Sequence, residues 1–418
     1  MRILFTTYAA RPHLYPLVPT AWAAVAAGHD VRLASTPALA DAVERTGLPS
    51  VTVGEDIDAD AWYRRGIFVP RSAYPGEPED AAWIRVTDQL ALKQFAIADA
   101  MAGGLVAYAE RWRPDVIVHD PVSFAGPVAA QVLGVPSVGH LYGMARHLRL
   151  EITDRTGTEP HPGFLELFDR FGVAPRVDPT LWIDPCPPSL RWPGQREIER
   201  RQIRYLPYNG PGAEPDPLGT AAAEEAAASP SPSVSAPAGR LRVCVTWGTS
   251  QQKKMGPGVI ELFGRIARAV AALDVEVLLT TGAVDAEQLR HLGPLPANVR
   301  QVGWIPLNML LADCSAIVHT GGTGVMMTAA ALGIPQLGIT KIPEGRFNVE
   351  RLAAVGAGLQ LDQDAAGDAE VRKAVDALLT EPAYRAAAGA LRRDVEAQPA
   401  PATAIPAVEA LAAEGLVP

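Results

Sequence analysis

The stretch AIVHTGGTG at residues 316–324 decides the fold of the second half of the chain. Residues 316–319 are an apolar run that ends in His319, the pattern of a buried strand, and the glycines after it permit a tight turn. A helical pattern, VMMTAAAL, follows at residues 325–332. A strand that enters a helix through a glycine turn gathers unpaired backbone N–H groups and the positive end of the helix dipole at one point. The stretch predicts a phosphate site that needs no lysine and to which His319 donates a hydrogen bond; a plain glycine turn beside a core histidine is the alternative.

Apolar strands alternate with helical patterns on both sides of this stretch. Further strands are expected at residues 2–7, 31–35, 115–120 and 135–138, and at 241–247, 275–280 and 299–302. Helices are expected at 19–27, 37–46 and 122–133, from about residue 259, and at 325–332, 347–355, 369–379 and 383–397. Such alternation is typical of parallel sheets covered on both faces. The predicted fold class is therefore α/β, with two Rossmann-like domains that face each other across a cleft.

A segment of different composition separates the two halves. Residues 209–240 are rich in Pro, Ser, Ala and Gly and lack apolar periodicity, which is typical of a flexible linker. The predicted organisation is an N-terminal domain at 1–208, the linker at 209–240, a C-terminal domain at 241–397 and a last helical segment at 398–418. A length of 418 residues fits two or three domains of ordinary size.

Composition and charge exclude several classes of protein. Hydrophobic residues make up 48% and charged residues 20%, as in an ordinary globular chain, and the net charge of −9 argues against a nucleic acid as the main ligand. The three cysteines, Cys186, Cys244 and Cys314, have no CxxC spacing and no histidine cluster beside them, so no zinc site is expected. No run approaches the ~18 apolar residues of a membrane span. We expect a cytoplasmic protein without a membrane partner.

Polar side chains follow two strands of the first half. His13 lies in RPHLYPLVP, just after the opening strand, and Asp120 ends the strand DVIVHD. An imidazole, whose unperturbed pKa is ~6.5, suits proton abstraction from a hydroxyl, and a carboxylate on its other ring nitrogen would orient it. A structural histidine and a helix-capping aspartate are the alternatives. Because both positions are at strand ends of one sheet, we expect them to meet.

Two short strings in the second half add candidates for the phosphate site. TWGTS at residues 246–250 places Thr249 and Ser250 after a strand, where their hydroxyls reach phosphate or cap a helix. VGWIP at residues 302–306 places Trp304 just past another strand, where it stacks on a flat base or belongs to the core.

Two other motifs do not indicate the activity with which they are usually associated. Asp56, Asp58 and Asp60 spell the DxD of metal-dependent sugar transferases, but they lie in an acidic loop of the other half, far from the phosphate turn. The turn after the first strand, TTYAARPH, lacks GxGxxG, which disfavours a dehydrogenase. No metal and no bound cofactor are expected.

The whole chain resembles the two-domain (GT-B) glycosyltransferases of antibiotic biosynthesis. It is most similar to actinobacterial enzymes that move deoxysugars from dTDP to polyketide aglycones. The resemblance rests on HLYPLVPTAWAAVAAGHDVRLAS, WRPDVIVHDPVSFAGPVAA, WIDPCPPSLRWPG, IRYLPYNGPG and IPLNMLLADCSAIVHTGGTGVMMTAAALGIPQL. It implies an acceptor-binding N-terminal domain, a nucleotide-sugar-binding C-terminal domain and a last helix that returns to the first domain.

The resemblance also implies roles for single residues. His13 would be the general base and Asp120 its orienting partner, in a direct displacement with inversion and without metal. The diphosphate would be held by His319, Gly321, Gly322, Thr323 and Gly324 with Thr249 and Ser250, and the thymine would lie beside Trp304 and Ile305. The dTDP-sugar is a co-substrate in this scheme, and no cofactor is needed.

One departure from the family pattern concerns the sugar. Many relatives carry Asp-Gln after the GIPQL strand to bind sugar hydroxyls, whereas PEGRFN places Glu344 and Gly345 there. The loss of the amide suggests a donor that lacks hydroxyls, and Glu344 could instead pair with the amino group of an aminosugar. In addition, Val325 stands where relatives often have Thr or Ser.

Several alternatives stay open. Some relatives need an auxiliary activator protein, for which residues 56–112 offer a docking surface or an acceptor-shaping loop. C-glycosylation of an aromatic polyketide, nucleotide-sugar epimerisation and a non-catalytic nucleotide-sugar-binding partner are the other readings of the same fold. The sequence does not identify the acceptor, the sugar, or the oligomeric state, including a homodimer.

Overall fold

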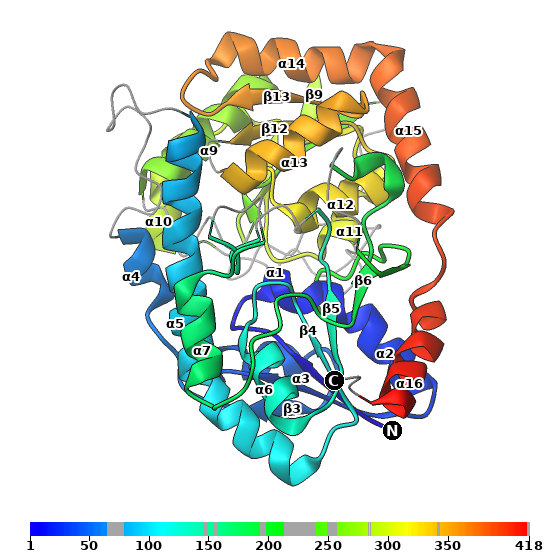
Figure 1. Cartoon of the computed structure of the whole chain (residues 1–418). Coiled ribbons are helices and arrows are strands. Elements are labelled where there is room, and N and C mark those ends of the chain that lie inside the picture. Colours follow the sequence, from blue (N-terminus) through cyan, green and yellow to red (C-terminus); the bar gives the residue numbers. More distant parts are fainter. Residues whose placement is uncertain are drawn as a thin grey trace, which may run out of the picture. The chain divides into compact units, whose positions relative to one another are not determined.

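The computed structural model describes residues 1–64, 79–144, 149–153, 158–192, 198–212, 240–248, 257–282, 284, 286–340 and 343–415. The chain divides into two compact units (Figure 1). Unit 1 holds Met1–Pro187, Arg191–Tyr205 and Gln398–Pro418, and unit 2 holds Pro188–Leu190 and Leu206–Ala397. Unit 2 thus resumes at residue 206, slightly before the boundary that the sequence suggests, and the part of the expected linker at 213–239 lies outside the described residues.

Unit 1 is built on a parallel sheet of seven strands in the order β3-β2-β1-β4-β5-β6-β7. The sequence predicts β1, β2, β4 and β5 close to their observed bounds and misses the other strands. β3 and β7 have three residues each, too few to show a period. The strands are β1 (Arg2–Thr6), β2 (Asp30–Ser35), β3 (Ser50–Thr52), β4 (Val116–His119), β5 (Ser137–His140), β6 (Leu181–Asp184) and β7 (Arg200–Gln202).

Helices bury the apolar residues of this sheet. Leu4 and Ile117 belong to a core cluster with residues of the long helix α5 (Glu79–Trp112), of α6 (Ala125–Leu133) and of α7 (Pro162–Asp169). α2 (Val18–Ala26) contacts β2, and α16 (Ile405–Glu414) contacts β4. The shorter helices of the unit are α1 (Arg11–Leu14), α3 (Ala40–Glu44) and α4 (Ala59–Arg64).

Helix α5 is long and apolar enough, over Ile84–Trp112, to pass a test for a membrane span by length and composition. This window is 56% buried inside the protein, and the helix packs on α6 and α7. The core helix of a soluble protein passes the same test, so the length and composition of α5 are weak evidence for a membrane span.

Unit 2 is built on a parallel sheet of six strands in the order β10-β9-β8-β11-β12-β13. The sequence predicts β9, β10 and β11 with their observed bounds. Together the two sheets confirm the α/β class and the two Rossmann-like units. The strands are β8 (Leu241–Val245), β9 (Val275–Thr280), β10 (Val299–Val302), β11 (Ala316–His319), β12 (Gln336–Thr340) and β13 (Gly358–Asp362).

Successive residues of β8 point to opposite faces, as they must in a strand. Val243 and Val245 join the core formed with α9 (Pro257–Ala271) and α14 (Asp368–Thr380), whereas Cys244 joins the core formed with α11 (Leu307–Leu310) and α12 (Thr323–Leu332). Both faces are therefore covered. The other helices are α10 (Ala286–Leu289), α13 (Pro343–Ala354) and α15 (Pro382–Glu396).

Each sheet reverses its strand order beside its first strand. In unit 1, β1 lies between β2 and β4, and in unit 2, β8 lies between β9 and β11. Open α/β sheets bind ligands at the carboxyl ends of the strands at such a switch point. The loops after β1 and β4, and those after β8 and β11, are therefore where functional side chains are expected.

The last segment of the chain belongs to unit 1. The backbone N–H of Arg204 donates to the carbonyl of Pro399 at 2.6 Å. Further on, a carboxylate oxygen of Glu409 in α16 lies 3.0 Å from Nε2 of His29. These contacts fix the C-terminal helix beside α2 and β2.

Candidate functional site

His13 lies in α1, the short helix that follows β1 at the switch point of unit 1. Its side chain is 14% exposed and lies between the rings of Tyr8 and Tyr142, with centroid distances of 4.5 and 4.6 Å. Its Nδ1 is 3.3 Å from Oδ1 of Asp120. A carboxylate accepts only, so this contact requires the proton of a neutral His13 to be on Nδ1. Nε2 is then an unprotonated base with no contact to another described residue.

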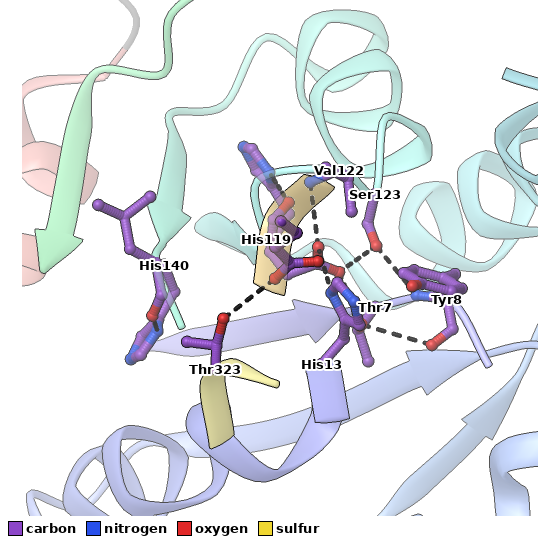
Figure 2. Close-up of polar contacts among 11 residues, drawn as sticks. Thr7, Tyr8, His13, His119, Val122, Ser123, His140 and Thr323 are labelled. Atoms are coloured by element: carbon purple, nitrogen blue, oxygen red, sulfur yellow. Dashed lines mark hydrogen bonds and ion pairs between the residues drawn. The ribbon is translucent and has the colours of Figure 1, made fainter. Parts of the chain in front are cut away.

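Asp120 follows β4 directly and is almost fully buried. Its Oδ1 accepts from the backbone N–H of Val122 at 3.0 Å as well as from His13. Its Oδ2 accepts from the hydroxyl of Thr7 at 2.6 Å and from the hydroxyl of Ser123 (Figure 2). Asp120 thus holds a turn and orients a histidine at once, so the capping role and the functional role suggested by the sequence are combined.

The surroundings of Asp120 keep its carboxylate ionised. Burial alone would raise the pKa of this group. The charge that His13 carries when it is protonated, the hydrogen bond with His13 and those from the Ser123 and Thr7 hydroxyls outweigh burial and lower the pKa. A permanently ionised acceptor is what an orienting partner of an imidazole requires.

Two neighbouring histidines are neutral and structural. Nδ1 of His119 donates to the carbonyl of Asp120 at 2.9 Å, and Nδ1 of His140 donates to the carbonyl of Leu141 at 2.8 Å. Nε2 of His140 then accepts from the hydroxyl of Thr20 at 2.8 Å. Burial lowers the pKa of His119, and it lowers that of His140 to about 4. These rings therefore carry no charge at neutral pH.

The glycine turn of unit 2 follows β11 as predicted, and His319 ends that strand. Its ring is buried, and both ring nitrogens are occupied: Nδ1 accepts from the backbone N–H of Gly321 at 2.9 Å, and Nε2 donates to Oε1 of Gln336 at 2.9 Å. Burial lowers the pKa of His319 to about 4. The prediction that this ring donates a hydrogen bond to a phosphate is therefore revised. The ring instead donates to Gln336 and accepts from the backbone of the glycine turn at Gly321.

The N-terminus of α12 lies at the end of this turn, with Gly322 as the residue before the helix. The hydroxyl of Thr323, the first residue of α12, donates to Oε1 of Glu344 at 3.0 Å (Figure 2) and accepts from Nδ2 of Asn348 at 2.9 Å. Nδ2 of Asn348 also donates to the carbonyl of Gly321 at 2.8 Å. α13 thus fixes the turn and places a carboxylate beside the helix N-terminus, where its charge is favourable.

Two glycine backbones meet where α12 and α13 begin. Gly321 has a φ of +78°, and a Cβ on it would lie 2.6 Å from the carbonyl oxygen of Gly345. A Cβ on Gly345 would lie 2.6 Å from both the carbonyl oxygen of Thr320 and the hydroxyl oxygen of Thr340. The turn therefore approaches α13 too closely for a side chain at either position.

The other residues expected at the donor site are less closely connected to the turn. Trp304 follows β10, is 39% exposed, and donates through its indole N–H to the carbonyl of Pro211 at 3.2 Å. Ile305 is half-buried and packs, like Val325 of α12, against the core beneath α12. Thr249 and Ser250 lie outside the described residues.

Two carboxylates of the DxD motif, Asp56 and Asp58, form hydrogen bonds within unit 1. Asp56 accepts from the hydroxyl of Thr36 at 2.6 Å and from the backbone N–H of Ala38, and Asp58 accepts from the backbone N–H of Ala61. Both carboxylates thus cap short helices. Within the described residues, no group of three or more His, Cys, Asp or Glu side chains could hold a metal ion.

The two units offer complementary chemistry. Unit 1 presents an imidazole oriented by an ionised carboxylate, and unit 2 presents a helix N-terminus after a glycine turn, which favours an anion. A hydroxyl that loses its proton while it displaces a phosphate leaving group needs both functions.

Sequence reasoning missed the residues that hold these groups in place. Thr7, Ser123 and Asn348 are polar residues that no motif in the sequence marks as functional, and their spatial neighbours reveal their roles. Ser123, three residues after Asp120, had the spacing of a turn motif that could have revealed it. Gln336 gave no signal, because its contact with His319 depends on the pairing of β11 with β12.

Comparisons with known proteins identify the family of the chain. The family model for the N-terminal domain of erythromycin biosynthesis protein CIII-like proteins matches residues 22–227, and the model for their C-terminal domain matches residues 265–411. The chain is 34% identical to the aclacinomycin-T 2-deoxy-L-fucose transferase of Streptomyces galilaeus, covering 99% of this chain and 97% of the relative. It is also 34% identical to the 10-deoxymethynolide desosaminyltransferase of Streptomyces venezuelae, covering 99% and 98%.

A solved structure shows the same architecture. The crystal structure of the glycosyltransferase VinC in complex with dTDP has a TM-score of 0.75 and 29% sequence identity, and the match covers 99% of this chain and 100% of VinC. The chain therefore belongs to the erythromycin biosynthesis protein CIII-like family and is a glycosyltransferase of the GT-B fold.

Proposed function

We propose that this glycosyltransferase moves a deoxysugar from a thymidine diphosphate sugar to a hydroxyl of a polyketide-type aglycone, with inversion and without a metal ion. Nε2 of His13 takes the proton of the acceptor hydroxyl. The hydroxyl oxygen forms a bond to the anomeric carbon while the bond from that carbon to the diphosphate breaks. Thymidine diphosphate leaves with the bonding electron pair.

The contact between His13 and Asp120 carries this proposal. It leaves Nε2 of His13 unprotonated, and the ionised carboxylate stabilises the imidazolium that forms when the proton arrives. A non-catalytic nucleotide-sugar-binding protein would have no need for such a pair. A positioned base of this kind typically contributes ~10²–10⁴-fold to the rate.

The N-terminus of α12 supports the metal-free part of the proposal. Backbone N–H groups and the helix dipole can offset the charge that develops on the departing diphosphate, which is the task of a metal ion in other transferases. Because both nitrogens of the His319 ring already bond to Gly321 and Gln336, the backbone N–H groups of Thr323 and its neighbours would bind the diphosphate. We therefore expect full transferase activity in the presence of a chelator.

Two observations bear on the sugar. The relatives transfer sugars named 2-deoxy-L-fucose and desosamine, and Glu344 places a carboxylate beside the N-terminus of α12. A carboxylate without a neighbouring amide suits a donor with few ring hydroxyls, and it would also attract an amino substituent. We therefore expect a deoxysugar or amino-deoxysugar donor.

The test uses the purified full chain with thymidine diphosphate deoxysugars, UDP-glucose and a set of polyketide aglycones. We expect transfer from the deoxysugar donors in the presence of EDTA, and NMR of the product should show an O-linkage with inverted anomeric configuration. Preference for UDP-glucose would refute the donor assignment, and retention or a C–C linkage would refute the mechanism. Binding of thymidine diphosphate with no turnover of any aglycone, even with an added activator protein, would favour the binding-partner alternative.

A further inference from the structure

The carboxylate of Asp120 has two oxygens with different partners, and the division between them has a consequence for His13. Oδ1 faces Nδ1 of His13 and the backbone N–H of Val122, while Oδ2 faces two hydroxyls, those of Thr7 and Ser123 (Figure 2). We propose that Thr7 and Ser123 are positioning residues that lock this carboxylate, and that the lock sets the tautomer of His13. The consequence for sugar transfer rests on the proposed function, whereas the lock itself does not.

A lock is needed because the last torsion of an aspartate side chain is soft. Rotation about the bond between Cβ and Cγ has broad minima, so a carboxylate held by one donor can turn its oxygens away from a weak partner. The contact with His13 is the longest of the contacts of Asp120, at 3.3 Å, against 2.6 Å for Thr7 and 3.0 Å for Val122. The shorter contacts therefore determine where Oδ1 points, and His13 uses that orientation.

The hydroxyl protons have defined targets. The backbone N–H of Tyr8 donates to Oγ of Ser123 at 2.9 Å, so this oxygen is already an acceptor and its own proton is available for Oδ2 of Asp120. The hydroxyl of Thr7 has a second acceptor, the carbonyl of Tyr8, but at 3.4 Å against 2.6 Å for Oδ2. Both protons thus point to the same carboxylate oxygen.

The hydroxyls also help to keep the carboxylate charged. Burial opposes the charge of Asp120, and hydrogen bonds from Ser123 and Thr7 act with His13 to keep its pKa below the ordinary value. A protonated Asp120 could donate to Nδ1 of His13 and would move the histidine proton to Nε2, the atom that must accept the proton of the substrate. Orientation and charge therefore act in the same direction.

The chain contains a matched control beside Thr7. Thr6 is the preceding residue, is equally buried, and its hydroxyl has no hydrogen-bond partner among the described residues. Successive residues of an extended segment point to opposite sides, which explains the difference. Thr6→Val and Thr7→Val remove the same atom from equally buried sites, but only Thr7→Val removes a donor to Asp120.

The experiment compares Thr6→Val, Thr7→Val, Ser123→Ala and the Thr7→Val/Ser123→Ala double variant, all as full-length chains. ¹⁵N NMR of the histidine rings in the free protein at pH 8 reports the tautomer of His13. We expect Nδ1–H in the wild type and in Thr6→Val, and a growing share of Nε2–H in Thr7→Val, Ser123→Ala and above all in the double variant. Thermal unfolding checks that each variant is folded, and Ser123→Ala, at a turn, serves if Thr7→Val does not fold.

Steady-state transfer kinetics give the second readout. We expect kcat to fall about tenfold in Thr7→Val and in Ser123→Ala with KM unchanged, which corresponds to about 1.4 kcal/mol of lost transition-state stabilisation. In Thr6→Val, kcat should stay at the wild-type value. If the wild type transfers no sugar, the proposed function fails while the NMR result still decides the lock. An unchanged His13 tautomer in the folded double variant would overturn the inference, whatever the kinetics show.

Discussion

The close approach of α13 to the glycine turn predicts opposite outcomes for the same substitution at two helical glycines, Gly345 and Gly389. In Gly345→Ala, the new Cβ would lie 2.6 Å from the carbonyl oxygen of Thr320 and from the hydroxyl oxygen of Thr340. Thr340 can move its hydroxyl, but the carbonyl of Thr320 belongs to the glycine turn. Overpacking of this kind costs about 1–3 kcal/mol, which exceeds the gain of up to about 1 kcal/mol from replacing a helical glycine by alanine.

Gly389 provides the matched control in the same unit. It lies inside α15, and the nearest atom to an added Cβ is the flexible Nη1 of Arg393 at 3.7 Å. Gly389→Ala should therefore stabilise unit 2 by about 0.5–1 kcal/mol through helix propensity. The propensity gain is common to both variants, so their free energies of unfolding should differ by the overpacking cost of about 1–3 kcal/mol, with opposite signs relative to the wild type.

Urea unfolding followed by circular dichroism measures this difference, and calorimetric titration with thymidine diphosphate measures the effect on the turn. We expect Gly345→Ala to lose about tenfold in affinity, equivalent to about 1.4 kcal/mol, because the shifted carbonyl of Thr320 displaces the N–H groups after it. Gly389→Ala should bind as the wild type does. If Gly345→Ala is as stable as Gly389→Ala and binds normally, the close approach of α13 to the turn is not a constraint, and the reasoning fails.

Three further predictions follow from the same contacts. Asp120→Asn should preserve folding and nucleotide affinity but lower kcat by ~10²–10⁴-fold, since an amide cannot stabilise the imidazolium; product formation that stays within tenfold of the wild type would contradict this. The pKa of His319 is about 4 in the folded chain against 6.5 for the free side chain, so only the unfolded chain takes up this proton between these values. The contribution of His319 to the free energy of unfolding is fully present above pH 6.5 and should be about 2 kcal/mol lower at pH 5. Urea unfolding at both pH values measures this loss. A His319→Asn variant whose stability depends as steeply on pH would speak against the assignment. Glu344→Gln should reduce the kcat/KM ratio between amino-deoxysugar and neutral deoxysugar donors, and an unchanged ratio would exclude an ion pair between Glu344 and the sugar.

The pairing of His13 with Asp120 could be predicted because it follows from topology. Apolar runs without alternation indicate parallel strands, and the carboxyl ends of parallel strands lie at one edge of the sheet. β1 and β4 are neighbours in that sheet, so residues that follow them come close together. Predictions of this kind need only the order and direction of strands.

The role of His319 could not be predicted in the same way, because it depends on which group faces a side chain. An imidazole at the end of a buried strand can point to a ligand or to a neighbouring strand. Gln336 decides between these, since its amide oxygen accepts from Nε2, and the backbone N–H of Gly321 occupies Nδ1. Neither contact could be predicted from the local pattern of residues. For the same reason, Thr7 could not be distinguished from any other buried hydroxyl, whereas the spacing of Ser123 from Asp120 was a local signal.

The position of Gly345 shows how the structure changes an argument drawn from sequence. The absent amide suggested a sugar that lacks the hydroxyl which the amide would bind. The structure leaves no room for a side chain at this position, because a Cβ on Gly345 would lie 2.6 Å from the carbonyl oxygen of Thr320. The close approach of the turn to α13 is thus a packing reason for glycine at this position, in addition to the proposed donor that lacks a hydroxyl. We expect Glu344, whose carboxylate accepts from the Thr323 hydroxyl at the N-terminus of α12, to contribute to discrimination among donors. A donor preference that survives Glu344→Gln would have to come from groups other than the residues after the GIPQL strand.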